Sequence, residues 1–514
     1  MLNSLRFSAY RTAMSLFTLL SFRFQAVTPL GLPGDGAVGF RPFAEVFPDM
    51  QIPGLYQASD FPEDESSRLR RIALSARLIG VVGRIAPAST PPVPEGEQPF
   101  IATVYPRLMR MAWPSPPAVP ARMRPSEGVG PDLLAELAAD GPFGSCLRVA
   151  TSDEAAMGAQ YVIDLDWMLG YRTFPGLLAP GGKAFLARDG DSLRTVGLSR
   201  AGDPLPLASW RGRQIERDAL LAAMNEDLTT VRHNAFVHLA TLTPFALATI
   251  NQMRGDHPVR RLLHHCFHTV LIGNRELGEL QLGGPRGFAA TIFSHAHVEV
   301  ARMIGDRLVG YDFWDFEPET QFARRGTTTT PFAYPYRDNV MELWSTTLAY
   351  VRRYLALYYD DAAVGADLQV SAWLDELDRL LPNGLGVRNQ VTVDWIARVC
   401  ATVIHVSTVE HDVLNNVTWN YSTLGWLVPT VAPVTGERMD QRRAFDLIST
   451  LVGTWKPYNM LLTADVPELA LDPAARAVMQ AWIDDLTRIQ AAMGAKGHEP
   501  SLSYPSNLNV SISN

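Results

Sequence analysis

Cysteine is scarce in this 514-residue sequence, and the three that occur, Cys146, Cys266 and Cys400, lie far apart. Their spacing fits neither a zinc site nor a disulfide framework, so we interpret them as buried or idle thiols. Charged residues are also few, at 19%, and no dense run of lysine and arginine occurs. With a formal net charge of −8, the chain is not expected to bind nucleic acid or an anionic membrane surface.

Long apolar runs are missing as well, so the sequence predicts no transmembrane segment. The nearest approach is Thr12 to Phe22, which follows Arg6 and Arg11 and resembles a weak secretory signal. Its four hydroxyl residues, and the Arg23 that follows, favour an amphipathic helix that covers the core. We therefore expect a cytoplasmic protein, with secretion through this weak signal as the alternative.

Apolar residues make up 47% of the chain, enough for one large core. Proline and glycine are frequent early on, so we expect residues 1–130 to wrap, as irregular structure and helices, around the part formed by 131–514. Short β-like runs follow, such as Gln160–Asp164 and Ala184–Arg188. Helix-compatible apolar spacing dominates after about residue 213, which predicts a mainly α fold with a small β annex.

The apolar periodicity predicts long helices in this second part, at Ala219–Met253, Asn339–Tyr359, Thr392–Thr418 and Ala474–Met493. Pro244 lies within the first of these helices and should kink or break it. A further helix is expected to begin at His257–Pro258, because proline suits a first helical turn.

Two pairs of residues on these helices could carry chemistry. The first pair, His233 and His238, is five residues apart. In a regular α-helix this spacing separates the side chains by about 140°, so they could not share a ligand. A π-type bulge, which bonds residue i to i+5, would bring them onto one face, and such bulges favour functional sites. Core packing is the alternative interpretation of this pair.

The second pair, His411 and Asn415, is four residues apart, so both side chains point the same way from a helix. The alternative interpretation is a buried polar pair or a contact on the helix surface. Imidazoles with oxygen donors and no thiolate favour iron or manganese over structural zinc.

The end of the chain adds a further candidate ligand. From Tyr504 to Asn514 it is neutral and partly β-prone, where most chains would fray. A docked terminus could present its main-chain carboxylate to a buried metal as the anionic ligand.

Together these pieces resemble the catalytic domain of the lipoxygenases. That family places His-x4-His on a long arched helix, His-x3-Asn on a second helix, and the carboxylate of its last residue at one metal ion. Other motifs similar to the family's occur at its spacing, namely Pro244–Thr249, His257–Leu263, Tyr336–Asn339, Leu343–Trp344 and Ala372–Trp373. The resemblance covers roughly residues 147–514, without the N-terminal β-barrel that plant and animal members use for membrane association.

The resemblance implies five metal ligands: His233, His238, His411, Asn415 and the terminal carboxylate of Asn514. The family most often ends in isoleucine, whereas Ile512 lies two residues short of the end here. We prefer Asn514, because the ligand is a main-chain group. The implied cofactor is iron, with manganese as the alternative, and the implied substrates are dioxygen and a polyunsaturated fatty acid or similar lipid. We expect a monomer.

The reaction that the resemblance implies begins at the methylene between two cis double bonds. Hydrogen is removed there with the metal as one-electron acceptor, and dioxygen adds to the resulting radical to give a lipid hydroperoxide.

Four positions depart from the family pattern, one of them Gly278, where an arginine is usual. Leu277 stands twenty residues after His257, where an alanine or glycine usually influences where dioxygen adds. Thr229 and Thr418 stand where glutamines that orient the ligands are frequent. These departures leave two alternatives open: hydroperoxide isomerisation or oxidation of another lipid-like substrate at the same metal site, and a catalytically inactive homologue.

The other histidines are expected to have structural roles. We predict a partly exposed polar face for His264, His265 and His268, and loop or surface positions for His295 and His297. His405 is predicted to be buried with its polar atoms satisfied.

Overall fold

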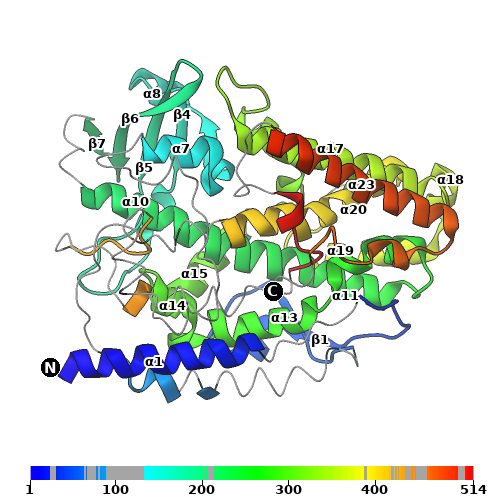
Figure 1. Cartoon of the computed structure of the whole chain (residues 1–514), viewed down its shortest axis with the longest axis horizontal. Coiled ribbons are helices and arrows are strands. Elements are labelled where there is room, and N and C mark those ends of the chain that lie inside the picture. The colour runs from blue at the N-terminus through cyan, green and yellow to red at the C-terminus, as the bar shows by residue number, and fades with distance from the viewer. Residues whose placement is uncertain are drawn as a thin grey trace.

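The computed structural model describes residues 2–23, 30–62, 65, 77–78, 81–87, 103, 132–201, 203–206, 214–386, 391–417, 422, 425, 428–434, 442–444, 446, 460–495 and 504–512. Within these residues the chain is mainly helical, and a five-stranded antiparallel sheet lies at one end of the helical body (Figure 1). The predicted mainly α fold with a small β annex is confirmed.

The elements fall into three groups, in which η marks a 3-10 or π-helical segment. The N-terminal group is α1 (Leu2–Arg23), β1 (Phe40–Pro42), α2 (Phe43–Val46) and β2 (Tyr56–Ala58). The annex is α7 (Leu133–Asp140), η2 (Pro142–Cys146), β3 (Leu147–Val149), α8 (Ser152–Ala156), β4 (Tyr161–Asp164), η3 (Asp166–Gly170), β5 (Lys183–Asp189), β6 (Ser192–Arg200) and β7 (Asp203–Pro206).

The helical body is the third and largest group. Its first half is α10 (Gln214–Glu226), η4 (Asp227–Leu242), α11 (Thr243–Gln252), α12 (Pro258–Leu263), η5 (His264–Phe267), α13 (Val270–Glu276), η6 (Leu277–Leu282), η7 (Gly284–Arg286), α14 (Phe288–Ile292), α15 (His297–Leu308) and η8 (Phe313–Phe316). Its second half is α16 (Pro318–Arg325), α17 (Pro335–Leu355), α18 (Asp361–Ala366), α19 (Leu368–Leu380), α20 (Val393–His405), η9 (Val406–Glu410), η10 (Val413–Val417), η11 (Val466–Leu469), α23 (Pro473–Ala495) and η12 (Pro505–Asn507).

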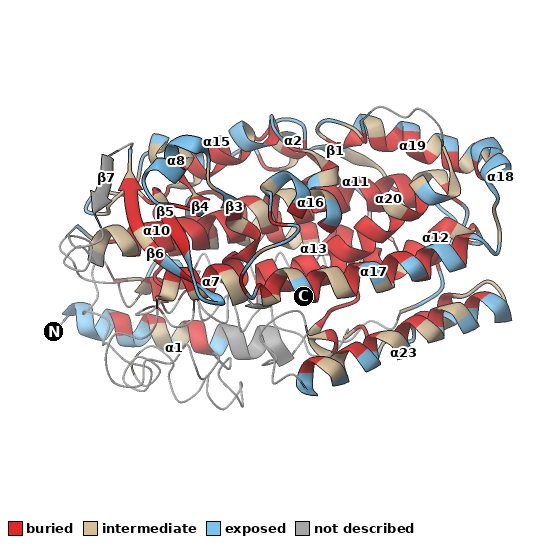
Figure 2. Ribbon diagram, turned by 90° about the horizontal axis from the view of Figure 1, so that it is seen from above, coloured by how far each residue is buried: buried red, intermediate tan, exposed pale blue. Residues whose placement is uncertain are grey.

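The core lies between the central helices of this body. Buried residues run along α11, α13 and α20, whereas α18 and α23 turn exposed faces outward (Figure 2). Helix α17 packs against α20 and α23, and α11 packs against α19. Large rings fill the contacts: Tyr350 stacks on Trp482 with centroids 4.5 Å apart, and Trp373 Nε1 donates to Thr249 Oγ1 at 3.0 Å.

Local chemistry sets the helix starts. Pro258 occupies the first turn of α12, as predicted, and His257 Nδ1 accepts the Val259 N–H at 3.2 Å. Helix α20 begins where the Thr392 hydroxyl accepts the Trp395 N–H at 3.1 Å. Pro244 does not break its helix. It falls in the first turn of α11, where the helix changes from π to α pitch, so its missing N–H is tolerated.

The predicted N-terminal helix is α1, whose Phe7, Tyr10 and Met14 side chains are buried. None of the helices in the described part of the chain combines the length and apolarity that a bilayer span requires.

Some histidines lie deeper than the sequence predicted. His265 and His268 are buried, so their predicted partly exposed positions are wrong, whereas His295 lies in the loop between α14 and α15, one of its two predicted positions, but is buried there. The His265 ring packs on Trp482, and the main-chain carbonyl of His268 accepts a hydrogen bond from Ser511. His295 Nδ1 lies 2.8 Å from the buried Glu226 carboxylate.

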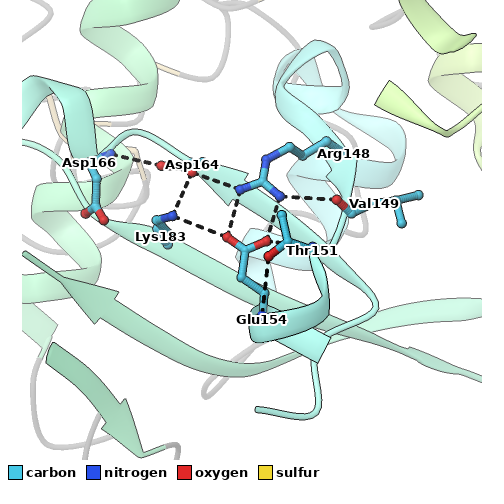
Figure 3. A network of polar contacts seen from close by, with 7 residues as sticks. All are labelled: Arg148, Val149, Thr151, Glu154, Asp164, Asp166 and Lys183. Carbon is cyan, nitrogen blue, oxygen red and sulfur yellow. Dashed lines mark hydrogen bonds and ion pairs between the residues drawn. The ribbon is translucent and has the colours of Figure 1, made fainter. Parts of the chain in front are cut away.

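The annex is stabilised by a network of four charged side chains across β3, β4, β5 and α8 (Figure 3). The guanidinium of Arg148 donates to both Glu154 oxygens at 2.7 and 2.8 Å, and to Asp164 at 2.8 Å. Lys183 lies 3.2 Å from Glu154 and 2.8 Å from Asp164. Glu154 also closes the capping box of α8 with Thr151. Its side chain is 8% exposed, so its charge depends on these partners.

We expect Glu154→Gln to destabilise the annex by about 2 kcal/mol at neutral pH, because it removes the charge that receives the Arg148 bonds. Arg148 holds the pKa of Glu154 well below its ordinary 4.5, so the stabilisation is complete above that pH and is lost as the pH falls. Denaturation midpoints of both proteins at several pH values would test this. Equal midpoints at pH 7 would contradict it.

Candidate metal centre

Helix η4 crosses the centre of the molecule between α10 and α11 (Figure 1) and has π pitch over 16 residues. His233 and His238, one i to i+5 step apart, therefore lie on the same side of it. Both are buried, and their Nε2 atoms are 3.1 Å apart. The predicted π-type geometry is confirmed, although it extends over a whole helix rather than a single bulge.

The third histidine comes from the other central helix. His411 follows η9 directly, on the continuation of α20, and is fully buried. Its ring centroid lies 4.9 Å from that of His233 and 5.2 Å from that of His238. One ring nitrogen from each of the three histidines lies within 4.8 Å of the other two. The structure thus brings together three residues that are up to 178 positions apart in the sequence.

These imidazoles are held neutral. Burial lowers the pKa of His238 to about 4, although the hydrogen bond that its ring donates to Asn274 opposes this effect. Burial also lowers the pKa of His233 and of His411 well below the ordinary 6.5, and the neighbouring histidines add to it. Neutral imidazole is the form that binds a metal ion.

Asn274, on α13, is a site residue that the sequence analysis missed. Its Nδ2 donates to the His238 carbonyl at 2.9 Å and to Thr243 Oγ1 at 2.7 Å. Its Oδ1 is therefore left to accept the His238 Nδ1–H, at 2.7 Å. This bond fixes the tautomer of His238 and leaves the Nε2 lone pair facing His233. The available signal was a lone amide side chain after the apolar run Val270–Ile272.

The cluster fits one metal ion. Both ring nitrogens of His411, and Nδ1 of His233, have no hydrogen-bond partner among the described residues. The 3.1 Å between His233 Nε2 and His238 Nε2 agrees with two nitrogens bound at about 2.1 Å and at right angles to one ion, which are about 3.0 Å apart. The same contact also suits a hydrogen bond in which His233 Nε2–H donates to His238 Nε2, whose own proton lies on Nδ1.

The other predicted site residues have different outcomes. Asn415 is buried on η10, four residues after His411, and Thr229 is buried on η4. Leu277 is the first residue of η6 and is 2% exposed. Thr418 and Asn514 lie outside the described residues.

The docked C-terminal segment is present as far as Ile512. Leu508, Val510 and Ile512 are buried, and the Ser511 hydroxyl donates to the His268 carbonyl at 2.8 Å. The Leu461 N–H donates to the Leu508 carbonyl at 2.7 Å. The segment is therefore fixed by packing and hydrogen bonds rather than frayed.

Comparison with known proteins supports a lipoxygenase relationship. The chain is 24% identical over 353 residues to linoleate 9S-lipoxygenase 1 of Hordeum vulgare, which covers 60% of this chain and 40% of that protein. It is 28% identical over 192 residues to linoleate 9/13-lipoxygenase of Pseudomonas aeruginosa, 36% of this chain and 27% of that protein. Hydroperoxide isomerase ALOXE3 of Mus musculus is 27% identical over 135 residues, which cover 26% of this chain and 19% of that protein. These alignments thus span 40% or less of each relative.

The fold comparison agrees with the sequence comparison. The crystal structure of coral 8R-lipoxygenase superposes with a TM-score of 0.74 and 14% identity, over 93% of this chain and 79% of that chain. No protein-family model matches the chain. The aligned relatives, the shared fold and the buried histidine cluster between two long helices lead to one conclusion: the chain is a distant relative of the lipoxygenases and has the fold of their catalytic domain.

Proposed function

We propose that this chain is a non-haem metal dioxygenase that converts a polyunsaturated fatty acid into a lipid hydroperoxide. The observation that carries the proposal is the buried cluster of His233, His238 and His411, with neutral imidazoles directed at one point. The names of the lipoxygenase relatives support the substrate class.

The proposed ligand set is these three histidines, the amide oxygen of Asn415 and the terminal carboxylate of Asn514. Imidazole and oxygen donors favour iron or manganese, and none of the three cysteines belongs to the cluster. When bound, such an ion supplies a one-electron acceptor for the removal of hydrogen from the methylene between two cis double bonds.

The chain's own residues supply the conditions for this chemistry. Asn274 orients His238 and keeps its Nε2 free of a proton. The buried apolar residues around η4, such as Val237, Leu239 and Leu242, exclude bulk water and suit a hydrocarbon substrate. Dioxygen can then add to the substrate radical in a site from which bulk water is excluded.

The experiment compares His411→Ala with His405→Ala. Both histidines are buried on the same continuous helix, but His405 packs edge-on against Trp344, 6.0 Å away, and is outside the cluster. We expect about one iron per chain, oxygen uptake with linoleic acid and conjugated-diene absorbance from the unaltered protein and from His405→Ala. His411→Ala should lose iron and activity by more than about tenfold. Iron and activity that survive in His411→Ala would refute the proposed site.

A second candidate function, hydroperoxide isomerisation at the same site, is favoured by the packing around Leu277. This side chain is 2% exposed, and a Cβ added to the neighbouring Gly278 would lie 2.3 Å from the Phe47 ring. If this position lies on the route of dioxygen, as the family resemblance implies, the route is filled. If the substrate were a lipid hydroperoxide whose O–O bond is cleaved, the resulting radical would then recombine with the released hydroxyl group rather than trap dioxygen.

Leu277→Ala should therefore increase oxygen uptake with linoleic acid, or change the position of oxygenation, because it opens space at this point. Leu282→Ala, which removes a buried leucine from the same segment η6, is the matched control. Oxygen electrode rates and product analysis provide the measurement. The same rates and products from Leu277→Ala and the unaltered protein would remove Leu277 from the account.

A further inference from the structure

One ion pair on η4 has the same five-residue spacing as the paired histidines. Arg232 Nε donates to Asp227 Oδ2 at 2.9 Å. The Asp227 side chain is 3% exposed and that of Arg232 is 24% exposed, so the carboxylate depends on this partner. The pair begins at the first residue of the π-helix, and Arg232 precedes His233 directly.

This spacing links the ion pair to the pitch of the helix. In an α-helix, residues i and i+5 point about 140° apart, so Asp227 and Arg232 would not face each other. In η4 the i to i+5 hydrogen bonding brings them together, in the same way that it brings His233 to His238. Because this contact forms in the π-helix and not in an α-helix, it stabilises the π-helix.

Other side chains repeat the spacing at the far end of η4. The Thr241 hydroxyl donates to the Phe236 carbonyl at 2.7 Å, and the Thr243 hydroxyl donates to the His238 carbonyl at 3.0 Å. Both bonds reach back five residues. In the first turn, the ion pair of Asp227 and Arg232 also joins residues five apart. The histidine pair therefore lies between side-chain contacts that all have the i to i+5 spacing of the π-helix.

Arg232 also fixes η4 to the annex. A second guanidinium nitrogen, Nη1, donates to the Ser145 carbonyl of η2 at 3.0 Å. The guanidinium is thus held from two sides, and the backbone that carries His233 is held with it.

We propose that Asp227 and Arg232 are positioning residues that hold η4 at π pitch and so set the separation of His233 and His238. The inference rests on the proposed function only in taking His233 and His238 as metal ligands. It predicts that loss of this ion pair weakens metal binding more than loss of an equivalent ion pair elsewhere in the protein does.

The chain offers a matched control in Arg148 and Glu154. That pair has similar exposure, 28% and 8%, and a similar distance of 2.7 Å, but it lies in the β annex. Asp227→Asn and Glu154→Gln each replace a buried carboxylate by an amide of the same size. Both should reduce thermal stability, since charge-assisted hydrogen bonds are about twice as strong as neutral ones.

The test titrates the metal-free proteins with Fe²⁺ under anaerobic conditions by calorimetry. We expect Asp227→Asn to bind Fe²⁺ about 10-fold more weakly or worse, as for other residues that orient metal ligands, and Glu154→Gln to bind as the unaltered protein does. Asp227→Glu, which keeps the charge, should recover most of the affinity. Equal affinity in Asp227→Asn and the unaltered protein would overturn the proposal.

Amide hydrogen exchange of the metal-free proteins provides a second readout, independent of metal. Residues 227–242 should exchange faster in Asp227→Asn than in Glu154→Gln, because the restraint on the first turn is lost. Unchanged exchange would overturn the proposal even if the affinity fell. If the unaltered protein binds no Fe²⁺, the proposed function fails, and the exchange comparison still decides the role of Asp227.

Discussion

The hydrogen-bond pitch of η4 is the constraint on which the candidate site depends. A π-helix of 16 residues is far longer than the single turns in which this geometry usually occurs. Its backbone is stabilised by its surroundings: nearly all of its side chains are buried, and its carbonyls receive additional donors. The His238 carbonyl alone accepts the Thr243 N–H, the Thr243 hydroxyl and the Asn274 amide. At α pitch, His233 and His238 would diverge and no shared site would exist.

The second central helix completes the arrangement. It runs from α20 through η9 to η10, and its η9 and η10 segments lie against η4 and deliver His411 to the same point. Burial between the two helices makes the imidazoles neutral, and Asn274 fixes the tautomer of one of them. Fold and electrostatics therefore act together: the packing that buries the imidazoles also leaves both ring nitrogens of His411 without a hydrogen-bond partner in the described part of the chain.

Much of this could be predicted from the sequence, because it depends on spacing. The interval between His233 and His238 required a π-type helix if the two were to meet, and His411 with Asn415 required a second helix. Pro258 marked a helix start correctly. Pro244, in contrast, did not break its helix, because the change from π to α pitch places it in a first turn.

What could not be predicted depends on tertiary contacts. Asn274 is far from the histidines in sequence and meets His238 only through the packing of α13. His295 lies in a loop, as predicted, but its burial could not be predicted, because its partner Glu226 is 69 residues away. The ion pair of Asp227 and Arg232 also has no meaning in the sequence until the pitch of η4 is known.

X-ray absorption spectroscopy of the iron-loaded protein tests the central claim most directly, since the claim concerns which atoms surround one ion. We predict a shell of nitrogen and oxygen donors without sulfur, and outer-shell scattering from three imidazoles. In His238→Ala that scattering should fall to two imidazoles. A sulfur-containing shell, or one with at most a single imidazole, would contradict the account.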